Sequence, residues 1–340
     1  MTGRVAQQQV VVVGAGISGV ACARELHEAG VAVRLLDRGR RLGGRMASRR
    51  FEGRPADIGA SYLTVEDDDF AAVVEGWRER GLAQPWTDTF GVLAPGEEPE
   101  VTSGPLRWGT PGGIRSLVES LAEGLDVVPG REVARAGRSA TGGLEVDGEP
   151  AAAVVLAMPD PQAARLLDPS AHADVHAALD VDFEPVLALT ATYAERCWRD
   201  LPHGAFVNDD PDLSWIADDG RRRGDDAPVL VAHSTPRLAA RHLDDPAGAG
   251  PALVAALGRL VGAAQEPGHA HVHRWSMARP TRGREHATYL LGEDLLGVCG
   301  DAWSARPRVE GAWLSGRDLG RALVRRLGRG SPTRPAQALS

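Results

Sequence analysis

Three glycines near the start of the chain have the spacing of a phosphate-binding turn. Gly14, Gly16 and Gly19 follow an apolar run and open a segment with helical spacing. Glycines at these positions allow a tight turn, let a pyrophosphate approach the backbone and let the helix pack closely on the strand. The phosphates then meet unpaired N–H groups at the helix start. We therefore predict a dinucleotide here, in contact with Ile17 and Ser18 as well.

An acidic residue follows at the spacing expected for ribose recognition. Asp37 ends the second apolar segment, where its carboxylate can accept hydrogen bonds from ribose hydroxyls. Arg38 is open to two interpretations, a solvated position or a cofactor contact, whereas Arg40, Arg49 and Arg50 are interpreted as solvated. These features favour a dinucleotide over a chance glycine turn, but they fit NAD as well as FAD.

A second glycine pair separates the two cofactors. Gly43 and Gly44 stand between Arg41 and Arg45. Adjacent glycines permit close backbone approach, and a guanidinium can pair with phosphate oxygens. The segment resembles the R-x-G-G-R-x-x-S/T segment of the FAD-dependent amine oxidase superfamily, in which the arginine and the backbone lie near the FAD pyrophosphate. The resemblance implies FAD as the cofactor, with Gly43, Gly44 and Arg45 among its contacts.

The run from residue 57 to 62 extends this resemblance. It is similar to the D-x-G-A-x-Y/F segment with which members of the superfamily pass beside the isoalloxazine ring. The similarity implies that Gly59, Ala60 and Ser61 contact the cofactor and that Tyr62 borders the substrate pocket. An ordinary packed tyrosine is the alternative interpretation of Tyr62.

The distal half of the cofactor site is expected from the other end of the chain. Gly300 and Asp301 end a short apolar run and are similar to the second FAD motif of the superfamily, where an acid contacts ribityl or pyrophosphate-linked groups. A helix N-cap is the alternative role of Asp301. The helix predicted soon afterwards can stabilise negative charge on the reduced flavin through its N-terminus. The remaining cofactor candidates are Glu310, Gly311 and Ala312 at that helix start, and Val133.

Within the superfamily, the chain most resembles the renalase-like branch. The resemblance rests on residues 57–64, 273–280 and 308–316, although Ile58, Ser61 and Leu63 depart from the histidine, glutamine and phenylalanine expected there. The branch implies oxidation of a dihydronicotinamide dinucleotide, with hydride passing to flavin N5 and electrons to O2 to give H2O2. Many amine oxidases place a lysine, through water, against flavin N5, and this chain contains no lysine. Amine oxidation is thereby less favoured.

The candidate substrate pocket is defined by residue type and position. Besides Tyr62 it includes His233, Trp275 and Arg279, because an aromatic ring can stack on a nicotinamide and an arginine can hold a phosphate. A structural role is the equal alternative for each. A neighbouring histidine series could suggest a metal, but no second set of supporting residues accompanies it, so we predict no metal site. Its members, His269, His271 and His273, alternate along one expected strand.

These residues require a two-part fold to position them. Expected strands over residues 9–13 and 31–37, joined by a helix that ends near Gly30, form a βαβ unit within a parallel sheet. We predict an α/β protein, a Rossmann-type FAD-binding domain with a second, mixed-sheet α+β substrate domain, like the amine oxidases or p-hydroxybenzoate hydroxylase. The FAD domain is expected from 1–65, 100–165 and 285–330, the substrate domain from 66–99 and 166–284, and a flexible tail over 331–340.

The second half shows strands in a less regular arrangement. Strands are expected near 186–192, 213–217, 229–234 and 271–277, with a helix over 252–261. Residues 95–111 are interpreted as a turn-rich part of an insertion. The run Gly-Arg-Arg-Arg-Gly-Asp-Asp at 220–226 is interpreted as a solvated turn between strands.

Composition indicates an ordinary globular enzyme acting on a small molecule. The formal net charge of −8 disfavours general attraction to nucleic acid or to an anionic membrane, and no apolar run is long enough to span a bilayer. Three scattered cysteines and no visible secretory signal favour the reducing cytoplasm. The oligomeric state is left open.

Three other functions remain open at this stage. An amine oxidase or desaturase of the same superfamily uses the same cofactor motifs. A flavin-bearing redox sensor without turnover keeps the cofactor but not the substrate chemistry. An NAD-dependent dehydrogenase would share only the first glycine turn.

Overall fold

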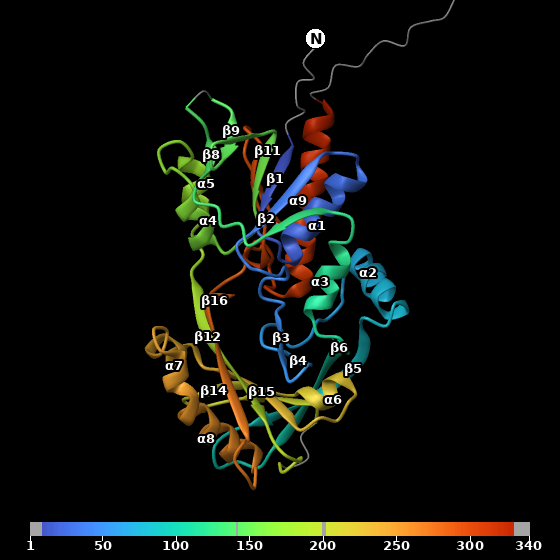
Figure 1. Ribbon diagram of the computed structural model, residues 1–340, viewed down its shortest axis with the longest axis vertical. Helices are drawn as coiled ribbons and strands as arrows, with labels where there is room; N and C mark the ends of the chain where they lie inside the picture. Colours follow the sequence, from blue (N-terminus) through green and yellow to red (C-terminus); the bar gives the residue numbers. More distant parts are fainter. Residues whose placement is uncertain (1–8, 141, 199–201, 330–340) are drawn as a thin grey trace, which may run out of the picture.

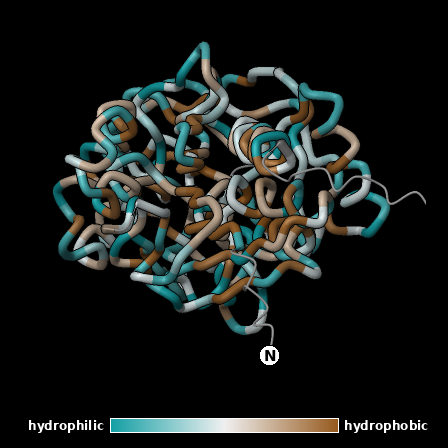
Figure 2. The backbone as a smooth tube through the Cα atoms, turned by 90° about the horizontal axis from the view of Figure 1, so that it is seen from above, coloured by the Kyte–Doolittle hydropathy of each residue, from teal (hydrophilic) through white to brown (hydrophobic). Residues whose placement is uncertain are grey.

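The computed structural model describes residues 9–140, 142–198 and 202–329, which form two bodies along the long axis of the molecule (Figure 1). The tail expected over 331–340 lies outside these residues. Each body is built on its own sheet, and β12 and β16 run between the two. Seen along the long axis, hydrophobic residues lie mostly inside and hydrophilic residues mostly on the outer loops (Figure 2).

A six-stranded sheet forms the first body, in the order β17-β18-β11-β1-β2-β7. Its strands pair in parallel except β17, which pairs antiparallel with β18. The central strands carry almost uninterrupted runs of buried valine and leucine, as expected where both faces of a sheet are covered. The strands are β1 (Val10–Val13), β2 (Val33–Asp37), β7 (Asp126–Pro129), β11 (Ala153–Leu156), β17 (Leu290–Leu291) and β18 (Leu296–Val298).

Helices cover one face of this sheet and a small sheet covers the other. On the helical face, α9 packs on α1 so closely that a Cβ at Gly316 would lie 1.9 Å from the Ser18 carbonyl oxygen. Leu319 and Leu323 of α9 are fully buried in the same core. The helices are α1 (Ile17–Glu28), α2 (Asp68–Glu79), α3 (Arg115–Leu121) and α9 (Val309–Arg329), and the small sheet is β8 (Ala136–Arg138), β9 (Leu144–Val146) and β10 (Glu149–Ala151).

The second body is a seven-stranded sheet in the order β16-β12-β15-β14-β13-β5-β6. It is mixed, because β5 pairs in parallel with β13 while the other pairings are antiparallel. The strands are β5 (Gln84–Leu93), β6 (Glu100–Gly109), β12 (Phe183–Thr192), β13 (Gly204–Val207), β14 (Leu213–Asp218), β15 (Val229–Ser234) and β16 (His269–Pro280). One face is covered by α7 (Pro236–Arg241) and α8 (Gly250–Val261) over a leucine-rich core.

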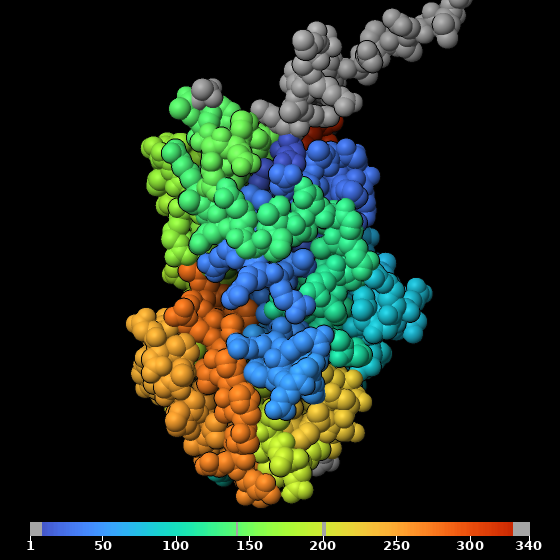
Figure 3. Space-filling view, viewed as in Figure 1, coloured from blue at the N-terminus to red at the C-terminus, as the bar shows by residue number. Residues whose placement is uncertain are grey.

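The opposite face of the second sheet looks toward the first body. A hairpin of β3 (Ser48–Phe51) and β4 (Arg54–Asp57) lies against β16 and near α6 (Asp219–Arg223) at the junction (Figure 3). The segment that follows β4 therefore lies between the two sheets.

Two short helices, α4 (Asp160–Leu166) and α5 (Ala173–Ala178), follow β11 outside this junction.

The predicted fold class and the βαβ unit are confirmed, but two segments lie in the other body from the one expected. Residues 95–111, expected to be turn-rich, contain the whole of the long strand β6, which pairs with β5 in the second sheet rather than joining the first body. Helix α2 buries Phe70, Val74 and Trp77 in the core of the first body, not of the second. The prediction missed β6 because glycine, proline and charged residues interrupt its alternation. None of the described helices is long and apolar enough to cross a membrane.

Candidate cofactor and substrate site

The glycine turn between β1 and α1 is as tight as its sequence predicts. Gly14 has a φ of +107°, and a Cβ there would lie 2.5 Å from the Ala157 carbonyl oxygen. A Cβ at Gly19 would lie 2.0 Å from the Gly14 carbonyl oxygen, so the helix and the turn are in direct contact. At Gly16 a Cβ would meet no described atom within 4 Å. The turn is thus packed on its protein side and open at Gly16.

The start of α1 suits an anion. Gly16 is the N-cap residue, so no side chain caps this helix, and its first turn carries no acidic residue. The N–H groups and the positive end of the helix dipole are therefore left for a negatively charged group from outside. The side chains of Ile17 and Ser18, the first two residues of α1, are themselves buried.

Asp37 lies beside this turn, as predicted. One carboxylate oxygen accepts the Ala15 N–H at 2.7 Å and the other accepts the Gly39 N–H at 2.6 Å. Each carboxylate oxygen can accept a second hydrogen bond, so the group retains capacity for ribose hydroxyls. Arg38 is exposed, and Val133 is buried among the valines of the same sheet.

The second glycine turn docks on the first. The Gly43 N–H donates to the Ala15 carbonyl at 2.8 Å, and a Cβ at Gly44 would lie 3.4 Å from the Gly16 Cα. Both glycines have positive φ values, +115° and +53°, which other residues seldom adopt. Arg115 of α3, which the sequence analysis missed, holds this segment by donating to the Leu42 carbonyl at 2.8 Å. The two turns thus form one glycine-lined surface, and this donor set fits a pyrophosphate.

Two charged candidates from opposite ends of the chain meet beside these turns. Arg45 donates to both oxygens of Asp301, at 2.8 and 2.6 Å. Asp301 also accepts the Ala302 N–H at 3.1 Å at the start of a short 3-10 helix, Asp301–Trp303, and this helix precedes α9. The carboxylate of Glu310 accepts the N–H groups of Glu66 and Asp67 at 2.6 and 2.7 Å. The Ala312 N–H donates to the Arg308 carbonyl at 3.0 Å, so neither this N–H nor the Glu310 side chain is a free group at the start of α9.

The segment after β4 runs alongside Arg45. The Ala60 N–H donates to the Arg45 carbonyl at 3.0 Å, and a Cβ at Gly59 would lie 1.9 Å from that oxygen. Gly59 is therefore required by close backbone approach. The segment Ile58–Ser61 lies between the first body, which carries the glycine turns, and the sheet of the second body. The family resemblance predicts the flavin ring beside this segment.

Tyr62 belongs to an aromatic cluster on the second sheet. Its ring lies 5.3 Å from Phe90, 5.7 Å from Trp215 and 6.3 Å from Trp86, measured between centroids. Burial raises the pKa of Tyr62, with the nearby Arg107 guanidinium opposing that shift. Arg107 stacks on the Phe90 ring at 4.2 Å. Packing within this cluster accounts for Tyr62, whose role at a substrate pocket remains a prediction.

Two other pocket candidates, His233 and Trp275, lie on one face of the second sheet. Ala188 pairs directly with His233 on one side and with His273 on the other, and directly paired residues point to the same face. Trp275 lies on that face too, with its ring 4.7 Å from His273 and its indole N–H donating to the Ile58 carbonyl at 2.7 Å. This face of the second sheet is therefore directed toward Ile58–Ser61, the segment that carries three of the cofactor candidates.

His233 provides a neutral imidazole and Arg279 a positively charged side chain. Burial, then Arg279 and Arg222, lower the pKa of His233 to about 3, so its imidazole is neutral at pH 7. Within the described residues its Nε2 atom is buried without a hydrogen-bond partner. Among those residues the exposed side chain of Arg279 has no ion pair or hydrogen bond, and Arg279 stands opposite Glu184 in the strand register. The roles of His233 and Arg279 in binding a substrate remain predictions.

The alternating histidines have a packing role on this face. The ring of Phe51, from the β3–β4 hairpin, lies 5.8 Å from His269 and 5.5 Å from His271. Burial lowers the pKa of His273 to about 4. In the part of the chain that the structure describes, no group of three potential ligand residues is arranged to hold a metal ion.

The interpretation of residues 220–226 as a solvated turn was wrong. Residues 219–223 form the helix α6, in which Arg222 and Arg223 are buried. Arg223 binds Asp57 at 3.0 Å and Asp219 at 2.9 Å, and Arg222 binds Asp219 as well. Burial alone would raise the pKa of Asp219, but Arg222, Arg223 and Arg54 outweigh it and lower that pKa. A run of like charges carries no sign of partners that lie far away in the sequence, so the prediction could not find this cluster.

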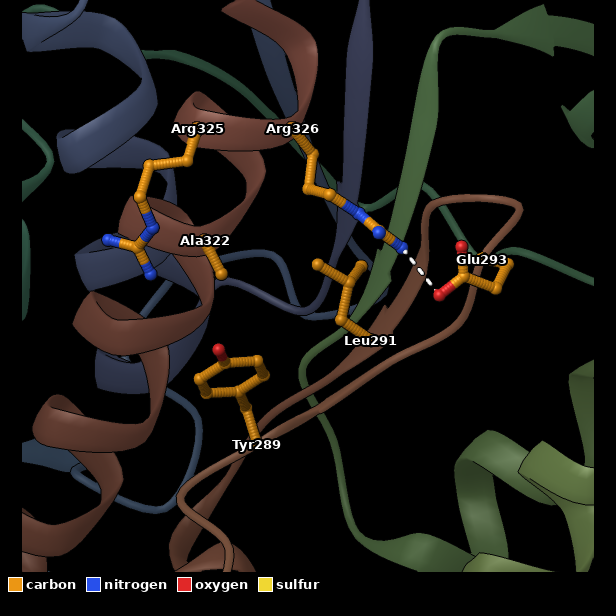
Figure 4. Close-up of a pocket in the computed structure, with 6 residues that line it drawn as sticks. All are labelled: Tyr289, Leu291, Glu293, Ala322, Arg325 and Arg326. Atoms are coloured by element: carbon orange, nitrogen blue, oxygen red, sulfur yellow. Dashed lines mark ion pairs between the residues drawn. The ribbon is translucent and has the colours of Figure 1, made fainter. Parts of the chain in front are cut away.

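A separate pocket of about 330 Å³ lies between α9 and the edge strand β17 (Figure 4). Tyr289 and Leu291 border it from the β17 side, and Ala322, Arg325 and Arg326 border it from α9. Arg326 is paired with Glu293 at 3.2 Å. None of the predicted cofactor or substrate residues lines this pocket.

Two protein-family models match the chain. Residues 12–76 match the NAD(P)-binding Rossmann-like domain, and residues 90–323, well over half of the chain, match the flavin containing amine oxidoreductases. Over 63 residues the chain is 44% identical to the Arabidopsis thaliana protein named "Probable polyamine oxidase 4", and over 54 residues it is 50% identical to polyamine oxidase 5 of Oryza sativa. These alignments span 18% and 16% of this chain but only 13% and 11% of the relatives.

Solved structures with the same fold cover almost the whole chain. Putrescine oxidase bound to putrescine superposes with a TM-score of 0.72 at 16% identity, covering 94% of this chain and 99% of that one. Cyclohexylamine oxidase from Brevibacterium oxydans superposes with a TM-score of 0.74 at 14% identity, covering 95% and 100%. At such identities the likeness concerns the fold.

Proposed function

The chain belongs to the flavin-containing amine oxidoreductase family, with FAD as its cofactor, and on that basis we propose that it is a renalase-like oxidase acting on a dihydronicotinamide nucleotide. FAD, when bound, supplies the hydride acceptor at N5 and passes the electrons to O2 to give H2O2. The protein supplies binding and orientation.

The observation that carries the substrate assignment is the unpaired Arg279. An amine substrate arrives as a cation, which a nearby guanidinium repels, whereas a nucleotide brings phosphate oxygens that a guanidinium binds well. Trp275 lies on the face that carries His233, whose pKa Arg279 helps to lower, and it offers a ring for stacking on a nicotinamide. The absence of lysine from the chain also favours a dihydronicotinamide over an amine as substrate, because no lysine ammonium group can be linked to the flavin by a water molecule.

The cofactor residues divide the work of holding FAD. We assign the pyrophosphate to the two glycine turns and the start of α1, and the ribose to Asp37. We assign the Arg45–Asp301 pair to the ribityl chain, and the positive end of the α9 dipole would stabilise negative charge on the reduced ring. In this proposal residues 9–65, parts of 100–165 and residues 285–329 form the FAD domain, and the second sheet forms the substrate domain.

An anaerobic reduction screen tests this function. Purified protein with FAD is mixed without oxygen with reduced nicotinamide nucleotides and their dihydro isomers, and in parallel with putrescine, spermidine and benzylamine, while the flavin absorbance is followed. We expect the dihydronicotinamides to bleach the flavin, and readmitted oxygen to restore it with formation of H2O2. Bleaching by an amine but by none of the dihydronicotinamides would reject the proposal.

Amine oxidation is the second candidate, because the relatives and neighbours are named as polyamine, putrescine and cyclohexylamine oxidases. The aromatic cluster around Tyr62 is the feature that favours it, since aromatic faces attract substrate cations. Arg107 already stacks within that cluster, which weighs against it. The same screen separates the two functions.

A further inference from the structure

The segment Ile58–Ser61 is held by three side chains from the second body. Trp275 of β16 donates to the Ile58 carbonyl at 2.7 Å, and Trp215 of β14 donates to the Ser61 hydroxyl at 3.1 Å. Arg222 of α6 donates to the Ser61 carbonyl at 2.9 Å. All three donors come from outside the body that holds the glycine turns, and each comes from a different element.

Arg222 differs from the two tryptophans in how it is supported. It has no exposed surface, and its guanidinium is fixed by Asp219 and faces Asp57 at 3.6 Å. Asp57 in turn accepts the Ser48 hydroxyl at 2.6 Å and the Ile114 N–H at 2.9 Å. A buried, doubly supported guanidinium has little freedom to move, so it defines the position of the carbonyl it binds.

Arg223 provides an internal comparison. It shares Asp57 and Asp219 with Arg222 and is almost as deeply buried. Its remaining bonds, however, go to the Thr110 and Pro111 carbonyls and not to Ser61. The two neighbours are thus matched in burial and charge and differ in whether they touch the segment 58–61.

We propose that Arg222 is a positioning residue that fixes the Ile58–Ser61 segment against the flavin ring, so that the substrate-binding body sets the environment of the cofactor. The proposal rests on the proposed function in one respect, the location of the flavin beside this segment. Loss of Arg222 then lets the segment shift and changes the flavin, whereas loss of Arg223 weakens the ion-pair cluster and leaves the segment in place.

The test compares Arg222→Met with Arg223→Met in the purified holoprotein, oxidised and without substrate. The readouts are the shape of the visible flavin spectrum, the flavin reduction potential and the dissociation constant of FAD. For Arg222→Met we expect a changed spectrum and potential, and about tenfold weaker FAD binding because FAD would then have to order the segment that it contacts. For Arg223→Met we expect lower thermal stability with the wild-type spectrum and potential.

Equal spectral changes in the two variants would show a purely structural role and overturn the proposal, as would a wild-type spectrum and potential in Arg222→Met. If Arg222→Met does not fold, Trp215→Phe decides, because it removes only the donor to the Ser61 hydroxyl and should move the spectrum in the same sense by a smaller amount. Arg222→Lys keeps a cation and a donor and should restore part of the wild-type spectrum. These readouts need no substrate, so a wrong substrate assignment does not affect them.

Discussion

The two bodies of this protein achieve rigidity by different means. The cofactor side of the first body is made of backbone, where glycine turns touch each other and the uncapped start of α1. The junction side of the second body is made of side chains, with three arginines and three aspartates joined across α6 and the β3–β4 hairpin. Backbone contacts of the first kind follow from local sequence, whereas the second kind depends on residues brought together by the fold.

The largest expected effect comes from breaking the charged cluster. Asp219→Asn leaves the buried Arg222 and Arg223 without their shared carboxylate and should lower the free energy of unfolding by about 3–5 kcal/mol. Asp225→Asn is the matched control, because Asp225 is 43% exposed and pairs with Arg54 alone, which predicts a loss below about 1 kcal/mol. Urea unfolding measures both. Equal losses of stability in the two variants would contradict the larger contribution assigned to the buried Asp219.

On the cofactor side, Gly16→Val is expected to separate binding from folding. No described atom lies within 4 Å of a Cβ at this position, so the protein without cofactor should keep its thermal stability. The added side chain occupies the open side of the turn and should weaken FAD binding on the order of a hundredfold. Gly76→Ala, on an open face of α2, should leave FAD binding unchanged. Unimpaired FAD binding by Gly16→Val would place the pyrophosphate elsewhere.

Acid should destabilise the second body through its buried histidines. The pKa values of His273 and His233 are lowered to about 4 and about 3, whereas the unfolded chain has the ordinary value of about 6.5. The unfolded state therefore binds more protons between these values. Stability is complete above about pH 6.5 and falls as the pH is lowered toward 4, by up to about 1.4 kcal/mol per pH unit for each group.

The variant His273→Phe sharpens this expectation. It keeps an aromatic ring beside Trp275 and removes one titrating group, so urea unfolding from pH 7 to pH 4 should show a shallower loss of stability than the wild type. His286→Phe, at a 96% exposed position, should follow the wild-type curve. If the unfolding free energy of His273→Phe depends on pH as steeply as that of the wild type, His273 is not a source of the acid sensitivity.

The sequence predicted what local geometry dictates. The turn at Gly14–Gly19, the partner turn at Gly43–Gly44 and the strand that ends at Asp37 are adjacent in the fold, because all three belong to one strand–helix–strand unit and the turn that follows it. The pairing of Arg45 with Asp301 was not predicted, although both residues were assigned to the cofactor.

The remainder needed the folded chain. Arg222 lies 161 residues from Ser61 in the sequence, and no pattern of spacing connects a carbonyl with a donor so far away. The arginine run was therefore interpreted as solvated. Arg115, which secures the Leu42 carbonyl, was missed for the same reason, since its partner is a backbone oxygen that leaves no mark in the sequence.

The substrate assignment is tested most directly by the dependence of flavin reduction on a substrate phosphate. The rate of anaerobic reduction is measured with dihydronicotinamide mononucleotide and with the corresponding riboside, in the wild type and in Arg279→Met. We expect the wild type to prefer the mononucleotide by about tenfold, as for one charge-assisted contact, and Arg279→Met to lose that preference while retaining FAD. Equal rates for the two compounds in the wild type, or an unchanged preference in the variant, would contradict the account.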